Sequence, residues 1–399
     1  MIKFEKFRAL IEAEEGTKLK HLDHPEDHPL LYGKSGVRKA IGSLNAVAEG
    51  RSEVTQKVDG APSIVTGHAV DPRDGKKKPF ISTKSAFNKN PKINFTPEDI
   101  DTNHGHAPGL ASKLKAGLEH LPKVLPKKGV FQGDMMFTSE DLQKNGKATT
   151  FTPNTISYTA RGDEAKKINK AKVGAVFHTK YEGNDLANAS AEPMTREDYA
   201  QFDQHPDVWH RSAHMDHAPL SPEDKKIFDN HIKMAEKAAN KGGDDMFANT
   251  AIHHGAGNHL VTYINHTIRS DESPSSEGFK SFVKGKMQKE VDKMKSDAGK
   301  TKKTAEMEGH LNHIDHNSDH YDNIFDLHKH LANAKHILIN HYNSKKSDIE
   351  HHINGDVADP EGFVANTSNG MIKLVDRPKF SKQNMLAGGI KQKKAEASQ

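Results

Sequence analysis

The chain lacks cysteine altogether, which excludes disulfide bonds, thiolate metal sites and cysteine nucleophiles. Apolar residues are also scarce: they make up 34% of the 399 residues, and the mean hydropathy is −0.81. Such values are low for one compact globule, so we expect one well-packed region and one polar region. No stretch approaches the roughly eighteen consecutive apolar residues of a membrane helix, and Met1–Arg8 lacks the apolar run of a secretion signal. The sequence therefore predicts a cytoplasmic protein with no membrane contact.

A strong excess of either charge is absent as well. Lysine and arginine number 58 against 54 acidic residues, so the net charge of +4 is only a weak indication of a nucleic-acid partner. Lysines cluster locally at residues 76–78, 127–128, 166–167, 302–303 and 391–394. These clusters could follow a phosphate backbone, and solvated loops are the alternative interpretation.

The pattern along the first half of the chain predicts helices followed by an antiparallel sheet. Apolar residues at helical spacing predict one helix over residues 2–15 and another that ends near Gly50. The pattern then changes to short β-type runs, with one helix at Gly109–Leu121 and a hairpin turn at Asn145-Gly146. The predicted strands are Val54–Val58, Ser63–Thr66, Phe80–Thr83, Val130–Phe131, Thr155–Thr159 and Val173–His178.

From about residue 183 to residue 355 the pattern is charged, rich in histidine and helical, without strands. Helices are predicted from Pro222, over Glu277–Ala298 and over Tyr321–Tyr342, with loops at 270–276 and 296–305. Strand-like sequence returns at 362–365 and 370–375. We therefore expect an α+β protein with five segments. These are N-terminal helices (1–50), a core (51–183), a helical insertion (184–355), the last core strands (356–385) and a basic disordered tail (386–399).

The tetrapeptide Lys57-Val58-Asp59-Gly60 ends the first predicted strand. A lysine amine has an ordinary pKa of about 10.4, so a nucleophilic lysine must be desolvated or placed beside metal and cationic groups. Attack of such an amine on the α-phosphate of a nucleotide would give a lysyl phosphoramidate and release pyrophosphate. Gly60 would let the backbone approach the nucleotide, and Asp59 could hold either the nucleotide or the folded turn.

The segments that follow Lys57 come in an order that resembles the covalent nucleotidyltransferase superfamily, which comprises ATP-dependent DNA ligases, RNA ligases and mRNA capping enzymes. That family has a lysine motif followed by a basic, an acidic, an aromatic, a Glu-Gly and a lysine-bearing strand. The matching segments here are Lys57–Gly60, Phe80–Ser85, Gly129–Asp134, Val173–His178, Pro360–Val364 and Gly370–Val375. The resemblance implies an antiparallel-sheet nucleotidyltransferase core of the ATP-grasp-like ligase adenylation type.

The same resemblance implies roles for individual residues. Lys57 would be the nucleophile, and Lys84 and Lys373 would contact phosphates. Asp134 would contact ribose or metal, Phe177 would stack on the purine, and Glu361 would orient a divalent metal. Gln56, Asp59 and Gly60 would complete the nucleotide site. The chain departs from the family at Pro62, at Gln56 and at Val375, where the family often has arginine, glutamate and a second lysine.

About two dozen residues follow Val375, too few for the oligonucleotide-binding barrel of DNA ligases and capping enzymes. The chain is therefore most like a phage-type RNA ligase, with ATP as donor, Mg²⁺ or Mn²⁺ as metal and the 184–355 insertion as a substrate-gripping module. We expect it to seal 5′-phosphate to 3′-hydroxyl ends, with RNA favoured and nicked or single-stranded ends as acceptors. Two alternatives remain: an adenylyltransferase with a non-nucleic-acid acceptor, and an inactive nucleic-acid-binding or virion-associated protein of the same fold.

Histidines offer a further candidate site. His310, His313, His316 and His320 fall at helical spacings of three and four, which suits zinc, although a polar helix face is the alternative. The histidines of His21–His28 are interrupted by Pro25, which favours a polar loop over a metal site.

Overall fold

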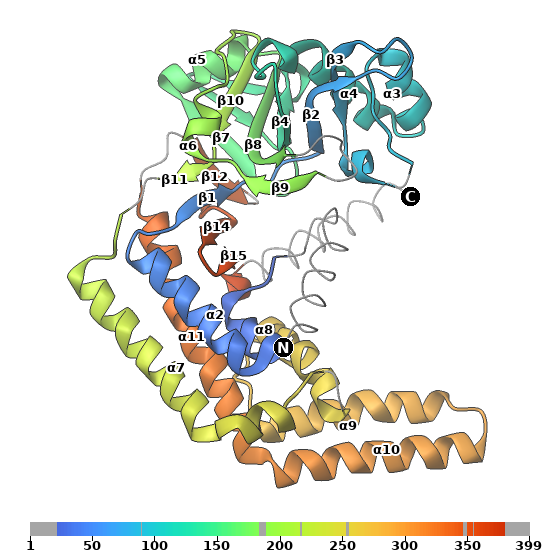
Figure 1. Cartoon of the computed structure of the whole chain (residues 1–399), viewed down its shortest axis with the longest axis vertical. Coiled ribbons are helices and arrows are strands. Elements are labelled where there is room, and N and C mark those ends of the chain that lie inside the picture. The colour runs from blue at the N-terminus through green and yellow to red at the C-terminus, as the bar shows by residue number, and fades with distance from the viewer. Residues whose placement is uncertain are drawn as a thin grey trace, which may run out of the picture. The chain divides into compact units, whose positions relative to one another are not determined.

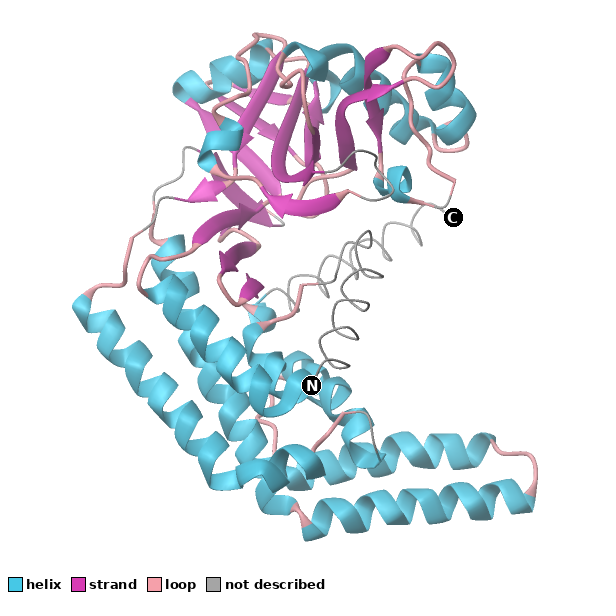
Figure 2. Ribbon diagram, viewed as in Figure 1, coloured by secondary structure: helices cyan, strands magenta, loops and turns pink. Residues whose placement is uncertain are grey.

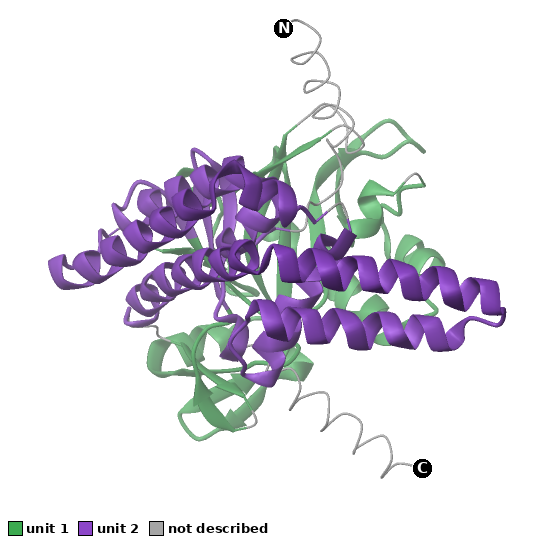
Figure 3. Cartoon of the chain, turned by 90° about the horizontal axis from the view of Figure 1, so that it is seen from below, with its two compact units in different colours: residues 1–21, 55–215, 346–361 green, residues 22–54, 216–345, 362–399 purple. Residues whose placement is uncertain are grey.

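A computed structural model describes residues 22–379, apart from 89, 183–188, 216–217, 253–254, 346–348 and 354 (Figure 1). The helix predicted over residues 2–15 and the basic tail from residue 386 lie outside the described residues. The chain forms two compact units (Figure 3). Unit 1 comprises residues 1–21, 55–215 and 346–361, and unit 2 comprises residues 22–54, 216–345 and 362–399.

Unit 1 holds a six-stranded sheet in the order β10-β8-β4-β2-β3, with β9 paired to β8. Its strands are β2 (Ser63–Val70), β3 (Lys77–Ser82), β4 (Val130–Thr138), β8 (Val173–Glu182), β9 (Ser190–Pro193) and β10 (Val208–Ser212). All pairs are antiparallel except β8–β10, which is parallel. One face packs on α4 (Pro108–His120), where Leu114 and Ile81 are fully buried in the same apolar cluster.

A second sheet of unit 1 has the order β13-β12-β7-β6-β5 and is antiparallel throughout (Figure 2). Its strands are β5 (Gln143–Asn145), β6 (Ala148–Phe151), β7 (Ser157–Arg161), β12 (Ile349–Ile353) and β13 (Asp356–Ala358). The predicted turn at Asn145-Gly146 joins β5 to β6, and Gly146 has a positive φ of 59°. Trp209 of β10 is buried in an apolar cluster with Phe151 and Ile349, so it anchors the packing and is not exposed to a base.

Smaller elements complete unit 1. They are η2 (Lys84–Phe87), α3 (Pro97–His104), η3 (Leu121–Lys123), η4 (Ser139–Asp141), α5 (Gly162–Lys170), α6 (Arg196–Tyr199) and β11 (His214–Met215). The strand β1 (Glu53–Lys57) carries the chain from unit 2 into unit 1, where the N–H of Gln56 donates to the carbonyl of Ala213 at 2.6 Å.

Unit 2 is mostly helical. Its elements are η1 (Pro25–Asp27), α2 (His28–Ala48), α7 (Pro222–Asn249), η5 (Gly255–His259), α8 (Leu260–Ser270), α9 (Ser276–Lys293), α10 (Asp297–His316), α11 (Ser318–Asn343), β14 (Gly362–Thr367) and β15 (Gly370–Leu374). The Ser221 side chain caps α7 by accepting from the N–H of Asp224 at 3.1 Å, as the sequence predicts. The strands β14 and β15 form an antiparallel hairpin. Among the described residues, every helix is too short or too polar to cross a lipid bilayer.

The expected α+β class is confirmed, with three sheets among the described residues. The expectation that strands are absent from 184–355 is wrong, because β9, β10, β11 and β12 lie there; β9, β10 and β12 extend the two sheets of unit 1, and β11 pairs in the third sheet. These strands have only two to five residues, and in β12 the polar His351 occupies a buried position, so no run of alternating apolar and polar residues marks them. The loop expected at 296–305 is also wrong. Ser296 caps α10 through the N–H of Gly299, and only Met307 and Ile314 of this polar helix are buried.

Candidate functional site

Lys57 lies at the end of β1 and forms an ion pair with Glu361, which follows β13. The two residues are 304 positions apart in the sequence, and both belong to unit 1. The Glu361 side chain is 7% exposed, whereas that of Lys57 is 36% exposed. The fold therefore brings the first and fifth of the predicted motifs into direct contact and leaves the amine within reach of solvent.

Asp59 holds the turn that follows Lys57. Its carboxylate accepts hydrogen bonds from the Asn154 side chain at 2.8 Å and from the N–H groups of Thr155 and Ile156 at 2.9 and 3.2 Å. Its own N–H donates to the Tyr158 hydroxyl at 2.8 Å. The loop between β6 and β7 thus fixes the backbone just beyond the lysine.

Asp134 on β4 lies against Gly60. A Cβ on Gly60 would come within 2.5 Å of the Asp134 Cβ, so only glycine allows this approach. Ser63 is directly opposite Asp134 in the β2–β4 ladder. Burial raises the pKa of Asp134 from 3.8 to about 7, although the neighbouring Ser63 hydroxyl and the charges of Lys57 and Lys84 oppose the rise. A carboxyl group perturbed in this way is characteristic of functional sites.

His178 on β8 is a residue of this site that the sequence interpretation missed. Its Nε2 is 3.8 Å from Asp134 Oδ2, and its Nδ1 is 2.8 Å from the Thr179 hydroxyl. Burial, together with the positive charges of Lys84 and Lys57, lowers the pKa of His178 to about 4. The histidine is therefore neutral near pH 7 and can present one hydrogen-bond donor and one acceptor.

Phe177 faces the other side of the sheet from His178. It is 1% exposed, and its ring packs on Phe202 with centroids 5.1 Å apart. Successive side chains of a strand point to opposite faces, so only one of Phe177 and His178 can face Asp134. In this structure the Phe177 ring is not accessible to a purine.

The other predicted nucleotide-binding residues are spread more widely. Lys84 is exposed at the start of η2, and its charge acts on both Asp134 and His178. The Gln56 side chain is 3.2 Å from the ring of His351 on β12. Lys373 lies on β15, which belongs to unit 2, and pairs with Val364. The structure thus gathers Lys57, Asp59, Gly60, Asp134 and Glu361 in unit 1, while Lys373 lies in the other unit.

The histidine cluster of residues 310–320 does not converge on one point. His316 is the last residue of α10, whereas His320 belongs to α11. His310 Nδ1 is 3.2 Å from the Met287 sulfur, and His313 Nε2 is 2.8 Å from the Asn249 carbonyl. No group of three or more metal-binding side chains occurs in the described part of the chain. Mg²⁺ often uses only one or two carboxylates together with substrate phosphates, and Asp134 and Glu361 are oxygen donors of that kind.

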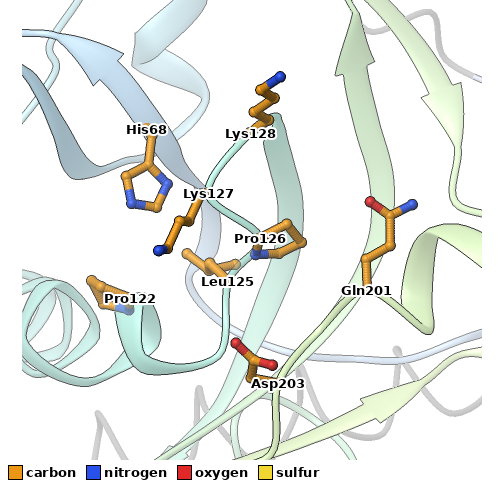
Figure 4. Close-up of a pocket in the computed structure, with 8 residues that line it drawn as sticks. All are labelled: His68, Pro122, Leu125, Pro126, Lys127, Lys128, Gln201 and Asp203. Carbon is orange, nitrogen blue, oxygen red and sulfur yellow. The ribbon is translucent and has the colours of Figure 1, made fainter.

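A surface pocket in unit 1 is distinct from this site (Figure 4). Its lining combines apolar and charged side chains: His68, Pro122, Leu125, Pro126, Lys127, Lys128, Gln201 and Asp203. None of these described residues is one of the predicted site residues.

The raised pKa of Asp134 gives a test of the site geometry. Because the folded state holds the Asp134 proton more tightly than the unfolded state, this carboxyl costs no stability below pH 4 and costs more as pH rises towards 7. A rise from 3.8 to about 7 corresponds to a cost of up to about 4 kcal/mol at pH 8. Asp134→Asn is therefore expected to increase the free energy of unfolding at pH 8 but not at pH 4, as measured by urea titration. Asp203→Asn, at an exposed carboxyl of the same unit, is the control. Equal or lower stability of Asp134→Asn at pH 8 would contradict this geometry.

Comparison with known proteins finds one match. Residues 19–388 match the model of a family described as a family of unknown function, DUF6267. No curated protein and no solved structure matches the chain.

Proposed function

The chain belongs to the DUF6267 family, and we propose that this member is a covalent nucleotidyltransferase, an ATP-dependent polynucleotide ligase that favours RNA. The observation that carries the proposal is the contact of Lys57 with Glu361 beside Asp134. The lysine lies at a strand end, near two carboxylates and near Gly60, a position that only glycine can occupy. This arrangement suits a nucleoside triphosphate and its cation.

The proposed reaction has three phosphoryl transfers. The Lys57 amine loses its proton and attacks the α-phosphorus of ATP, so that a nitrogen–phosphorus bond forms and pyrophosphate leaves. An oxygen of the 5′-phosphate at a nucleic-acid end then attacks the phosphorus of the lysyl-AMP, so that a phosphoanhydride bond forms, the nitrogen–phosphorus bond breaks and the Lys57 amine leaves and regains its proton. Finally a 3′-hydroxyl attacks that 5′-phosphorus, the strand is sealed and AMP leaves.

The residues of unit 1 have distinct parts in this reaction. Glu361 positions the Lys57 amine through their ion pair, and the Asp59 turn holds the backbone on which the amine is carried. His178 and Lys84 place a neutral ring and a positive charge beside Asp134. Asp134 and Glu361 would hold a bound Mg²⁺, which would neutralise charge on the phosphates.

Mass spectrometry of the protein after incubation with ATP and Mg²⁺ or Mn²⁺ tests the proposal. We expect a mass increase of one AMP, mapped by peptide analysis to Lys57 and released by acid. The modified protein is then mixed with 5′-phosphorylated RNA, nicked duplexes or single-stranded DNA, and sealed products are expected with RNA first. An adduct without any sealing would favour adenylyl transfer to another acceptor. The absence of an adduct with either metal would favour the inactive binding protein.

A further inference from the structure

The helices α9 and α10 of unit 2 form a hairpin that extends away from the pair α7 and α11 (Figures 1 and 3). Its base is held by aromatic packing. Phe279 of α9 is fully buried and lies 5.0 Å from Tyr321 and 5.3 Å from Tyr263, measured between ring centroids. A firmly anchored base means that side chains near the turn of the hairpin are presented on a fixed support.

The outer part of this hairpin, residues 284–303, carries a strong excess of positive charge. We call it the basic tip. It contains eight lysines and three acidic residues, a net charge of 8 − 3 = +5. The whole chain carries +4, so all remaining residues together carry 4 − 5 = −1. The basic tip is therefore the part of this hairpin with the largest net positive charge.

Most charges of the basic tip are not paired within the protein. Lys303 pairs with Glu290 at 2.9 Å and with Glu306 at 3.1 Å. Among the described residues, the other seven lysines have no ion pair, and six of them are exposed: Lys284, Lys289, Lys293, Lys295, Lys300 and Lys302. At the base, by contrast, Lys280 pairs with Asp315 at 2.6 Å. Unpaired lysines at one end of a hairpin are free to contact an external polyanion.

We propose that the basic tip binds the phosphodiester backbone of the nucleic-acid acceptor, independently of base sequence. The identification of that strand as an acceptor rests on the proposed function. No aromatic residue occurs between 284 and 303, so stacking on bases does not contribute, and lysines contact phosphates as point charges. An anionic membrane fits less well, because Met294 is the one large apolar side chain exposed in the basic tip as described, and interfacial binding needs a broad apolar face.

The test compares two full-length variants with the same change in charge. In the tip variant, Lys289, Lys293, Lys295 and Lys300 are replaced by glutamine. In the control variant, the exposed α7 lysines Lys226, Lys233, Lys237 and Lys241 are replaced by glutamine. Binding of a 5′-phosphorylated single-stranded RNA and of the matching DNA is measured over a range of salt concentrations.

We expect the tip variant to raise the Kd for RNA at least about tenfold. The slope of log K against log salt should become smaller by up to about 3, because each of the four lost phosphate contacts contributes about 0.7 on single strands. The control variant should change the Kd less than twofold. Equal weakening in both variants, or no weakening in either, would overturn the proposal. So would loss of binding to phosphatidylserine-containing vesicles in the tip variant with unchanged RNA binding.

The failure of this inference can be told apart from the failure of the proposed function. AMP labelling of Lys57 is measured in the same two variants and should match wild type. Tip-dependent RNA binding without any labelling of wild type would remove the proposed function and leave the nucleic-acid contact in place. Normal AMP labelling together with equally weakened RNA binding in both variants would remove the inference about the basic tip and leave the proposed function in place.

Discussion

Replacement of Lys57 by alanine is expected to abolish covalent labelling by ATP that carries the label on its α-phosphate, a loss of at least about 10⁴-fold. Without the amine, no atom at this position can form the nitrogen–phosphorus bond. Gel electrophoresis under denaturing conditions, followed by quantification of the protein-bound label, measures the effect.

Lys57→Arg separates the nucleophile from the ion pair. A guanidinium can still pair with Glu361, but it stays protonated and cannot attack phosphorus. We therefore expect Lys57→Arg to fold normally and to be as inactive as Lys57→Ala. Retained labelling in Lys57→Arg would show that another residue is modified.

Glu361→Gln tests the partner of the lysine. The amide keeps the shape of the side chain but removes the charge that positions the amine, so labelling should fall by about 10²-fold or more without disappearing. Asp163→Asn is the matched control, because Asp163 is an exposed carboxylate of unit 1 that pairs with a lysine, Lys166, at 2.8 Å. Labelling of this control should equal that of wild type.

The sequence could indicate which residues belong to the candidate site, but not all of its geometry. Lys57, Asp134 and Glu361 were selected by the order of motifs, and the fold places them together in unit 1. The contact of Lys57 with Glu361 joins positions 304 apart, which no local pattern encodes. Strand alternation shows from the sequence alone that only one of Phe177 and His178 can face the site, because neighbours in a strand point to opposite sides. Which side is the core depends on where α4 packs, and that is a tertiary property.

The same distinction holds for the fold. Caps and apolar stripes identified α7 and α11, because these signals are local. The pairing of β12 with β7 was missed, because short strands far apart in sequence have no shared pattern. The sequence of His21–His28 predicts a polar loop, yet Glu26 and Asp27 of this segment are buried in unit 2. Their burial depends on basic partners that come some three hundred residues later in the chain.

Those partners form a buried ionic cluster within unit 2. Lys335 of α11 pairs with Glu26, and the two side chains are 4% and 1% exposed. Arg377 donates to both carboxylate oxygens of Asp27, at 2.8 and 3.1 Å, and His328 Nε2 lies 3.1 Å from the same carboxylate. Burial alone would raise the pKa of Glu26, but Lys335 and the neighbouring basic residues His24 and Arg377 together outweigh it and lower that pKa to about 2. The cluster is stable only as a balanced set of charges.

Lys335→Met is therefore expected to lower the free energy of unfolding by about 3–5 kcal/mol, because it leaves the Glu26 carboxylate buried and uncompensated. Urea unfolding followed by circular dichroism measures the loss. The stability that Glu26 contributes is present above pH 4.5 and lost as pH falls towards 2, so the deficit of the variant should be largest near pH 7 and smaller near pH 3.

Two further variants show whether the loss comes from the buried charge. Lys280→Met removes an exposed ion pair of the same unit, in which the two side chains are 39% and 50% exposed, and should cost no more than about 1 kcal/mol. The double variant Glu26→Gln with Lys335→Met removes both charges of the buried pair and should be more stable than Lys335→Met alone. Equal losses for Lys335→Met and Lys280→Met, or no recovery in the double variant, would mean that packing of the lysine stem and not charge balance stabilises the cluster.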